Sequence, residues 1–136
     1  MSMLALAPLA AIVAMQAGSL PPLDFSETFT GHDGTVYAYD KTAIRQITRS
    51  GHTVRSVSVR VTYPASVNPV VSQSVRGYYV RCSERTAGVL SSINTARDTG
   101  RISMNNTKLE AIVYRPFDEL ELAERGVMAV VCAASL

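Results

Sequence analysis

In residues 53–64, TVRSVSVRVTYP, polar and apolar side chains alternate from Ser56 to Tyr63, and this limits the possible folds of the 136-residue chain more than any other feature. Successive side chains of a β-strand point to opposite faces, so the segment predicts a strand with one buried and one polar face. The buried set is Val57, Val59, Val61 and Tyr63, and the polar set is Ser56, Ser58, Arg60 and Thr62. The chain must therefore contain a sheet with a core on one side.

Further segments have strand character because they are β-branched or aromatic and are bounded by turn residues. They are residues 35–40, 74–82, 86–97, 100–105 and 108–116, and residues 41–53 follow the first of them with a turn at Ser50 and Gly51. In SVRGYYVRC, residues 74–82, Tyr78 and Val80 share a side with Cys82, whereas Tyr79 and Arg81 point the other way. The proline-rich loop before this segment predicts that it pairs antiparallel with the alternating strand.

The C-terminal residues 116–134 change to a helical period, with apolar residues every three or four positions. Asp118 and Glu119 follow Pro116 in the first turn, where the helix dipole favours acids. One helix is predicted; the alternative is a short helix that ends at Gly126, followed by a strand over 127–132. The expected fold class is α+β, a single antiparallel sheet with a C-terminal helix packed on it.

The N-terminal run MSMLALAPLAAIVAMQAG carries no charged side chain. Pro8 and Gln16 interrupt it, and a membrane span needs about 20 apolar residues, so a secretory signal peptide over 1–17 fits better than a stable transmembrane segment. The alternative is a retained N-terminal helix. Residues 18–34 predict an extended segment that leads into one domain, 35–136, with regular structure from about Thr35. We expect an exported protein of the periplasm or cell surface.

Cys82 and Cys132 are the two cysteines of the chain. In an exported protein, two cysteines far apart in sequence most simply form a disulfide, whereas in the cytosol both would stay reduced. A loop of about 50 residues closed in this way would remove about 4 kcal/mol of conformational freedom from the unfolded chain. Pairing would tie the C-terminal helix to the sheet.

The formal net charge is only +2, but the charges are segregated along the chain. Residues 41–109 carry nine Arg and two Lys against two acids, whereas 1–40 and 110–136 are net acidic. One interpretation is internal neutralisation of a basic sheet by acidic segments. The other is an exposed basic face for an anionic partner, since arginine suits contacts to carboxylate, sulfate or phosphate. Arg60, Tyr79 and Arg81, on the outward side of the central strands, are the candidate binding residues.

Sequence patterns of catalysis and cofactor binding are missing from the chain. It lacks G-x-S-x-G, Walker A, G-x-G-x-x-G and H-E-x-x-H patterns. His32 and His52 each adjoin a glycine in turn-like sequence and are too few for a zinc site. A Cys–His nucleophile pair would need a thiol that disulfide formation removes. We expect no enzymatic activity, no metal, no cofactor and no nucleic-acid partner.

YAYD at 37–40, Ile44 after it, the alternating strand, the aromatic strand ending in Cys82, and YRPFDELELAERGVMAVVC at 114–132 together resemble the surface-adhesin protein E family of Gram-negative bacteria. The resemblance covers about residues 34–133. It implies an antiparallel sheet with a disulfide-bound C-terminal helix, and a surface or periplasmic protein that binds host matrix or plasma proteins such as vitronectin and laminin. The chain departs from the family in having no Trp and no lipoprotein cysteine.

These observations predict a non-enzymatic, adhesin-like binding protein of the cell envelope. Its partner would be an anionic envelope polysaccharide or lipid, or a host matrix protein, held on the basic sheet face. Two other classes stay open. One is a structural subunit of the envelope or of a filament that retains its apolar N-terminal segment, and the other is a periplasmic inhibitor of a hydrolase.

Overall fold

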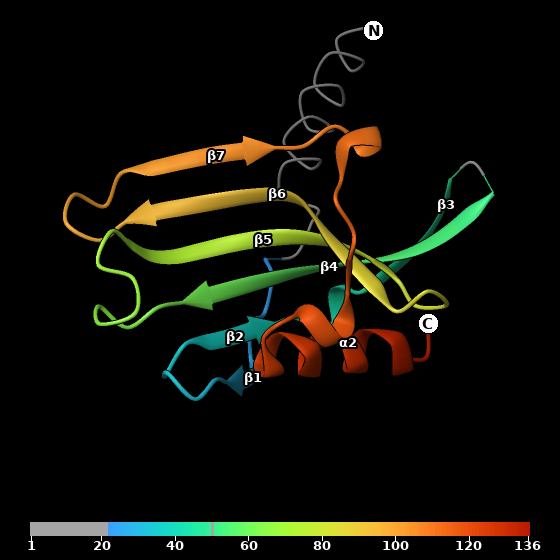
Figure 1. The fold of residues 1–136 in the computed structure, drawn as a ribbon, viewed down its shortest axis with the longest axis horizontal. Helices are drawn as coiled ribbons and strands as arrows, with labels where there is room; N and C mark the ends of the chain where they lie inside the picture. Colours follow the sequence, from blue (N-terminus) through green and yellow to red (C-terminus); the bar gives the residue numbers. More distant parts are fainter. Residues whose placement is uncertain (1–21, 50) are drawn as a thin grey trace, which may run out of the picture.

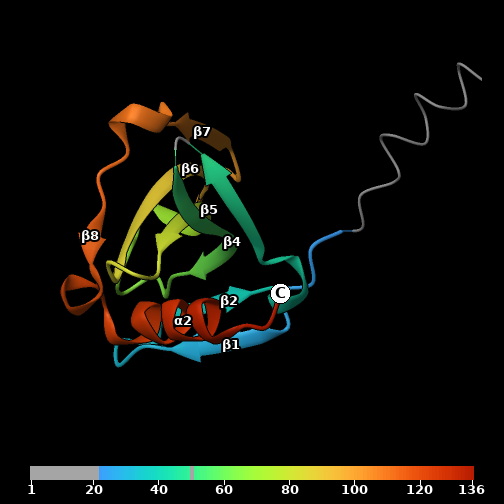
Figure 2. The same cartoon turned by 90° about the vertical axis from the view of Figure 1, so that its right-hand side faces the viewer.

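The computed structural model describes residues 22–49 and 51–136. The expected signal peptide, residues 1–17, lies outside this range. In the described residues, one antiparallel sheet curls into a half-barrel around the C-terminal α-helix, as Figures 1 and 2 show. The strands are β1 (Glu27–Thr30), β2 (Val36–Tyr39), β3 (Arg45–Arg49), β4 (His52–Thr62), β5 (Val71–Arg81), β6 (Thr86–Ala96), β7 (Ile102–Asn106) and β8 (Arg115–Pro116). The helix is α2 (Leu122–Ala133), and short 3-10 turns are η1 (Lys41–Ala43), η2 (Leu109–Ala111) and η3 (Phe117–Glu119).

The sheet runs in the order β1-β2-β4-β5-β6-β7, and every pairing is antiparallel. Two further strands, β3 and β8, belong to the sheet but stand outside this order. β3 pairs with the first half of β4 while β2 pairs with its second half, and β8 pairs with the start of β6. The long strands β4, β5 and β6 therefore form the frame on which the other segments are fixed.

The predicted parity of β4 is confirmed, because Val57, Val59 and Val61 are buried on the face that packs against α2. We call this the inner face, and Tyr78 and Val80 of β5 contribute to the same core. The opposite, outer face carries a second, small core. It consists of Val54, Tyr79 and Ile112, with Ile47, Leu90 and Tyr114 packed against it.

The C-terminal segment forms one helix, and the alternative of a strand after Gly126 is wrong. The helix begins at Leu122, later than the sequence pattern suggested. Residues 117–119 make only a 3-10 turn, and Leu120 is extended with its side chain in the core. Gly126 is needed within the helix because a β-carbon there would lie 2.7 Å from the ring of Phe29. None of the helices in the described ranges is long and apolar enough to cross a membrane.

The Cys82–Cys132 disulfide predicted from the sequence is present, with the two Cα atoms 5.6 Å apart. It joins the end of β5 to the last turn of α2. Nη1 of Arg55, on β4, donates to the carbonyl oxygens of Val131 and Ala134, both at 2.8 Å. Carbonyls at a helix C-terminus have no partner within the helix, so a cation there is favourable. The end of α2 is thus held both by the disulfide and by an arginine.

Two expectations about extended segments are wrong. Regular structure begins at Glu27 instead of near Thr35, because β1 adds an edge strand with Phe29 opposite Tyr37. Four residues are too short for alternation to be recognised. In the expected strand 108–116, only Arg115 and Pro116 pair with the sheet, whereas Leu109–Ala111 forms a 3-10 turn.

Candidate binding cleft on the outer face

The eleven arginines differ in what their guanidinium groups contact. Five donate hydrogen bonds to backbone carbonyls: Arg45, Arg55, Arg97, Arg115 and Arg125. Arg76 makes the one ion pair among the described residues, with Glu124 at 3.4 Å. Among the described residues, the acidic helix therefore neutralises the basic charge of the sheet through one ion pair, Arg76 with Glu124. Arginines outside these two groups are the ones left to meet a partner.

The three candidate residues lie on the outer face, as their parity predicts, but they do not form one site. Arg60 stands opposite Val75 on β5, and Arg81 lies six residues further along that strand, about 20 Å away at 3.3 Å per residue. The guanidinium carbon of Arg60 lies 5.0 Å from the ring centroid of Phe25. Tyr79 is buried in the outer core. Its parity predicts an exposed side chain, but the segment around Ile112, which has no clear period in the sequence, covers it.

A cleft of about 520 Å³ opens beside two of these residues, and we call it the outer cleft. It lies between the β3–β4 hairpin, β5 and the segment that includes η2. Its polar and aromatic lining is Arg49, His52, Tyr79, Arg81, Glu110 and Tyr114. Arg49 stands opposite His52 in the hairpin register. Arg49 is not among the residues predicted from the sequence, although its position next to the predicted turn at Gly51 places it near His52.

Arg81 is held in a specific position in the outer cleft. Its guanidinium carbon lies 3.7 Å from the centroid of the Tyr114 ring, and its Nε atom is buried without a hydrogen-bond partner. Stacking on an aromatic ring fixes the guanidinium plane and leaves its N–H groups free for another acceptor. A buried donor without a partner costs about 1–3 kcal/mol. This cost belongs to Nε, whereas an anionic ligand in the cleft would accept from the terminal N–H groups of Arg81.

Gly88 allows the wall of the outer cleft to lie against β6. It stands opposite Tyr79 in the sheet. A β-carbon at this position would lie 2.9 Å from the carbonyl oxygen of Val113 and would collide with the Ile112 side chain. The backbone after η2 could then not keep its place, so this glycine fixes Tyr114 over Arg81.

Substitution Gly88→Ala is expected to lower the free energy of unfolding by about 1–3 kcal/mol, because overpacking forces the 112–114 backbone away from the sheet. Urea unfolding measures the effect. The matched change Val89→Ala, which trims a more exposed side chain of the same strand, should change stability by less than about 1 kcal/mol. Equal effects of the two substitutions would contradict the close packing at Gly88.

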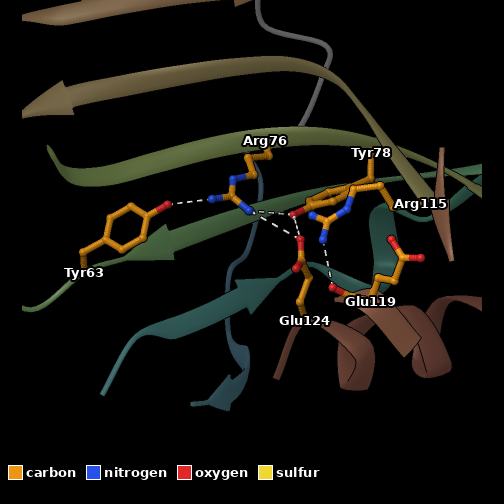
Figure 3. Close-up of polar contacts among 6 residues, drawn as sticks. All are labelled: Tyr63, Arg76, Tyr78, Arg115, Glu119 and Glu124. Carbon is orange, nitrogen blue, oxygen red and sulfur yellow. Dashed lines mark hydrogen bonds and ion pairs between the residues drawn. The ribbon is translucent and has the colours of Figure 1, made fainter. Parts of the chain in front are cut away.

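A second polar group lies on the inner face, between α2 and the sheet (Figure 3). Oε2 of Glu124 accepts from the Tyr78 hydroxyl at 2.5 Å and from Nη1 of Arg76 at 3.4 Å. Nη2 of Arg76 donates to the Tyr63 hydroxyl at 2.6 Å. Burial raises the pKa of Tyr78 above its ordinary value, and it raises that of nearby Tyr37 to about 12. The hydroxyls of Tyr78 and Tyr37 therefore stay protonated. The hydrogen bonds among Glu124, Arg76 and Tyr78 link α2 to the sheet.

Within the described residues, no three His, Cys, Asp or Glu side chains come together in a way that could hold a metal ion. His32 and His52 lie in separate hollows. Comparison of the chain with protein-family models, with curated proteins and with solved structures gives no match, so the similarity to the surface-adhesin protein E family stays a prediction from motifs.

Proposed function

We propose that this chain is a non-enzymatic, exported binding protein that holds an anionic polymer of the cell envelope or of a host matrix in the outer cleft. Arg49 and Arg81 would contact the sulfate, phosphate or carboxylate groups of the polymer. The observation that carries the proposal is the guanidinium of Arg81, stacked on Tyr114 in the lining of the cleft. This moves the predicted binding site away from Arg60 and toward the β3–β4 hairpin.

The composition of the outer cleft supports an anionic ligand. Two arginines and His52 line it against one acid, Glu110. Its volume of about 520 Å³ lies in the usual range for ligand sites, about 300–1,000 Å³, which suits a short segment of a larger polymer. Tyr79, which packs in the small outer core, also lines the cleft. The guanidinium of Arg81 can bind an oxyanion through two parallel hydrogen bonds, whereas an ammonium group acts as a point charge.

The disulfide supports export, because such bonds persist in oxidising compartments and are rare in the cytosol. An adhesin-like role and a place at the cell surface or in the periplasm follow from this proposal and from the motif resemblance. The assembly-subunit class depends on the N-terminal run, outside the described residues. It and the hydrolase-inhibitor class stay predictions without a contact that favours them.

Heparin serves as the test polymer. The double substitution Arg49→Ser and Arg81→Ser is expected to weaken binding of a heparin oligosaccharide by about 100-fold or more, since hydrogen bonds to charged groups contribute about 1.5–3 kcal/mol each. The measurement is isothermal titration calorimetry at several salt concentrations. The slope of log K against log salt should also become shallower, because two fewer polymer charges are neutralised.

The matched control is the double substitution Arg60→Ser and Arg101→Ser, which removes the same charge away from the outer cleft. It should weaken heparin binding by less than about fivefold through net charge alone. Arg81→Lys, which keeps the charge and loses the planar group, should fall between wild type and Arg81→Ser. If the control weakens binding as much as the cleft variant, heparin binds by general attraction and the outer cleft is not the site. Binding to immobilised vitronectin but not to heparin would assign the cleft to a protein partner.

A further inference from the structure

A second hollow lies on the outer face beside the outer cleft, and we call it the serine hollow. Its volume is about 320 Å³. Three hydroxyl side chains and three apolar ones are part of its lining: Ser56, Ser58, Ser91, Ala43, Ile47 and Leu90. Tyr79 lines both the serine hollow and the outer cleft, so the two spaces adjoin. A polymer held in the outer cleft can therefore continue into the serine hollow.

A glycine opens the middle of the serine hollow. Ser58, Gly77 and Ser91 stand opposite one another in the register of β4, β5 and β6. Because neighbouring strands lie about 4.8 Å apart, the two serines flank a gap of about 10 Å over the glycine. A β-carbon at Gly77 would lie 2.8 Å from the hydroxyl oxygen of Ser91. The missing side chain thus leaves both hydroxyls on one shared space.

The lining of the serine hollow contains no charged side chain among the described residues. Arg45 stands opposite Ser56, but its guanidinium donates to two backbone carbonyl oxygens at 3.0 and 3.1 Å. Arg60, two residues beyond Ser58, lies over the ring of Phe25. An anionic group in the serine hollow would lose water without gaining a counter-charge, which is unfavourable. The two adjoining spaces therefore favour different parts of a ligand.

We propose that the serine hollow binds a neutral, N-acetylated sugar of the same polymer whose anionic group lies in the outer cleft. The ligand class is then an acidic polysaccharide in which uronate and N-acetylated sugars alternate. This inference rests on the proposed function. The methyl of an N-acetyl group can pack on the apolar part of the lining. Its N–H and C=O groups can pair with serine hydroxyls, which both donate and accept.

Two further features favour such a polymer over one that is charged at every unit. Along β5, Arg81 of the outer cleft and Gly77 of the serine hollow are about 13 Å apart at 3.3 Å per residue, so the two spaces hold different sugar units. Glu110 in the outer cleft repels additional anionic groups, but it can accept hydrogen bonds from sugar hydroxyls.

Isothermal titration calorimetry with two hexasaccharides tests the inference at physiological salt. In the hyaluronan hexasaccharide, glucuronate alternates with N-acetylglucosamine, whereas the galacturonate hexasaccharide carries a carboxylate on every unit. We expect the wild-type chain to bind the hyaluronan hexasaccharide about tenfold more tightly, through hydrogen bonds and packing in the serine hollow. A site that recognises charge alone would prefer the galacturonate hexasaccharide, which has twice as many carboxylates.

The double substitution Ser58→Val and Ser91→Val removes two hydroxyls and narrows the gap over Gly77. It should weaken binding of the hyaluronan hexasaccharide about tenfold and change binding of the galacturonate hexasaccharide by less than about twofold. Valine suits a strand, so the variant should fold, and circular dichroism checks this. The matched control is Thr62→Val and Thr95→Val, which removes two hydroxyls of the same face outside this lining and should change neither affinity.

Equal affinities of the wild-type chain for the two hexasaccharides, tighter binding of the galacturonate one, or no binding of hyaluronan would overturn the inference. So would unchanged hyaluronan binding in the serine variant. After any of these results, loss of heparin binding in the Arg49→Ser, Arg81→Ser variant would still support the outer cleft as an anion site. If that variant retains heparin binding, the proposed function itself fails, and this inference fails with it.

Discussion

Replacing Cys132 by serine is expected to lower the free energy of unfolding by about 2–5 kcal/mol under oxidising conditions. The disulfide closes a loop with a sequence separation of 50, so its loss returns much conformational freedom to the unfolded chain. It also leaves the last turn of α2 held mainly by Arg55. A loss of this size is a large part of the roughly 5–15 kcal/mol typical of a whole domain. Urea unfolding followed by circular dichroism measures it.

Two controls separate the cross-link from the chemistry of the substituted side chain. Reduction of the wild-type protein should shift the urea midpoint by nearly as much as the substitution. The double variant Cys82→Ser and Cys132→Ser should resemble the single variant, because either change removes the same bond. An unchanged midpoint in both variants would mean that the bond contributes nothing to the stability of the fold, and it would weaken the case for an oxidising compartment.

Replacing Glu124 by alanine is expected to lower the free energy of unfolding by about 2–4 kcal/mol. Breaking a buried ion pair on one side costs about 3–5 kcal/mol, and the partial exposure of Arg76, 23% for its side chain, reduces this. The substitution leaves the Arg76 guanidinium between the two tyrosine hydroxyls without its counter-charge. It also removes the acceptor of the Tyr78 hydroxyl.

A comparison of two substitutions at Glu124 separates the contribution of its charge from that of its hydrogen bond to Tyr78. Glu124→Gln retains an acceptor for Tyr78 and should cost less than Glu124→Ala. A double-mutant cycle of Glu124→Gln with Arg76→Met should show coupling of about 1 kcal/mol or more, as residues in one hydrogen-bonded network do. Additive effects in that cycle would show that the pair does not link α2 to the sheet energetically.

Local patterns predicted much of this fold. The alternation within 53–64 predicts β4 and its buried face. The alternation before Cys82 correctly predicts that Tyr78 and Val80 face the inner core and that Tyr79 faces the other side. The helix and the disulfide followed from a change of period and from the two cysteines. The curl of the sheet into a half-barrel did not, because it depends on where strands share a neighbour: β2 and β3 both pair with β4. The β2–β4 pairing joins residues distant in sequence, such as Val36 and Thr62, and leaves no local period.

The candidate site was predicted only in part, for a related reason. Parity placed Arg60, Tyr79 and Arg81 on one face correctly. It could not show that the segment around Ile112 crosses that face, buries Tyr79 and brings Tyr114 against Arg81. Residues 108–116 follow neither a strand nor a helical period for most of their length. The β3–β4 hairpin is local, and its turn was predicted, but what brings Arg49 into the cleft is the distant segment around Tyr114 on the other side.

The proposed binding site can be located by titrating a ¹⁵N-labelled sample with a heparin oligosaccharide and following amide chemical shifts by NMR. We expect the largest shift changes at Arg49, His52, Arg81 and Tyr114, around the outer cleft, with small changes near Arg60 and along α2. Saturation at a single affinity that is lost in the Arg49→Ser, Arg81→Ser variant would support the cleft as the site. Changes spread over all exposed arginines, or centred on Arg60 with the outer cleft unaffected, would contradict it.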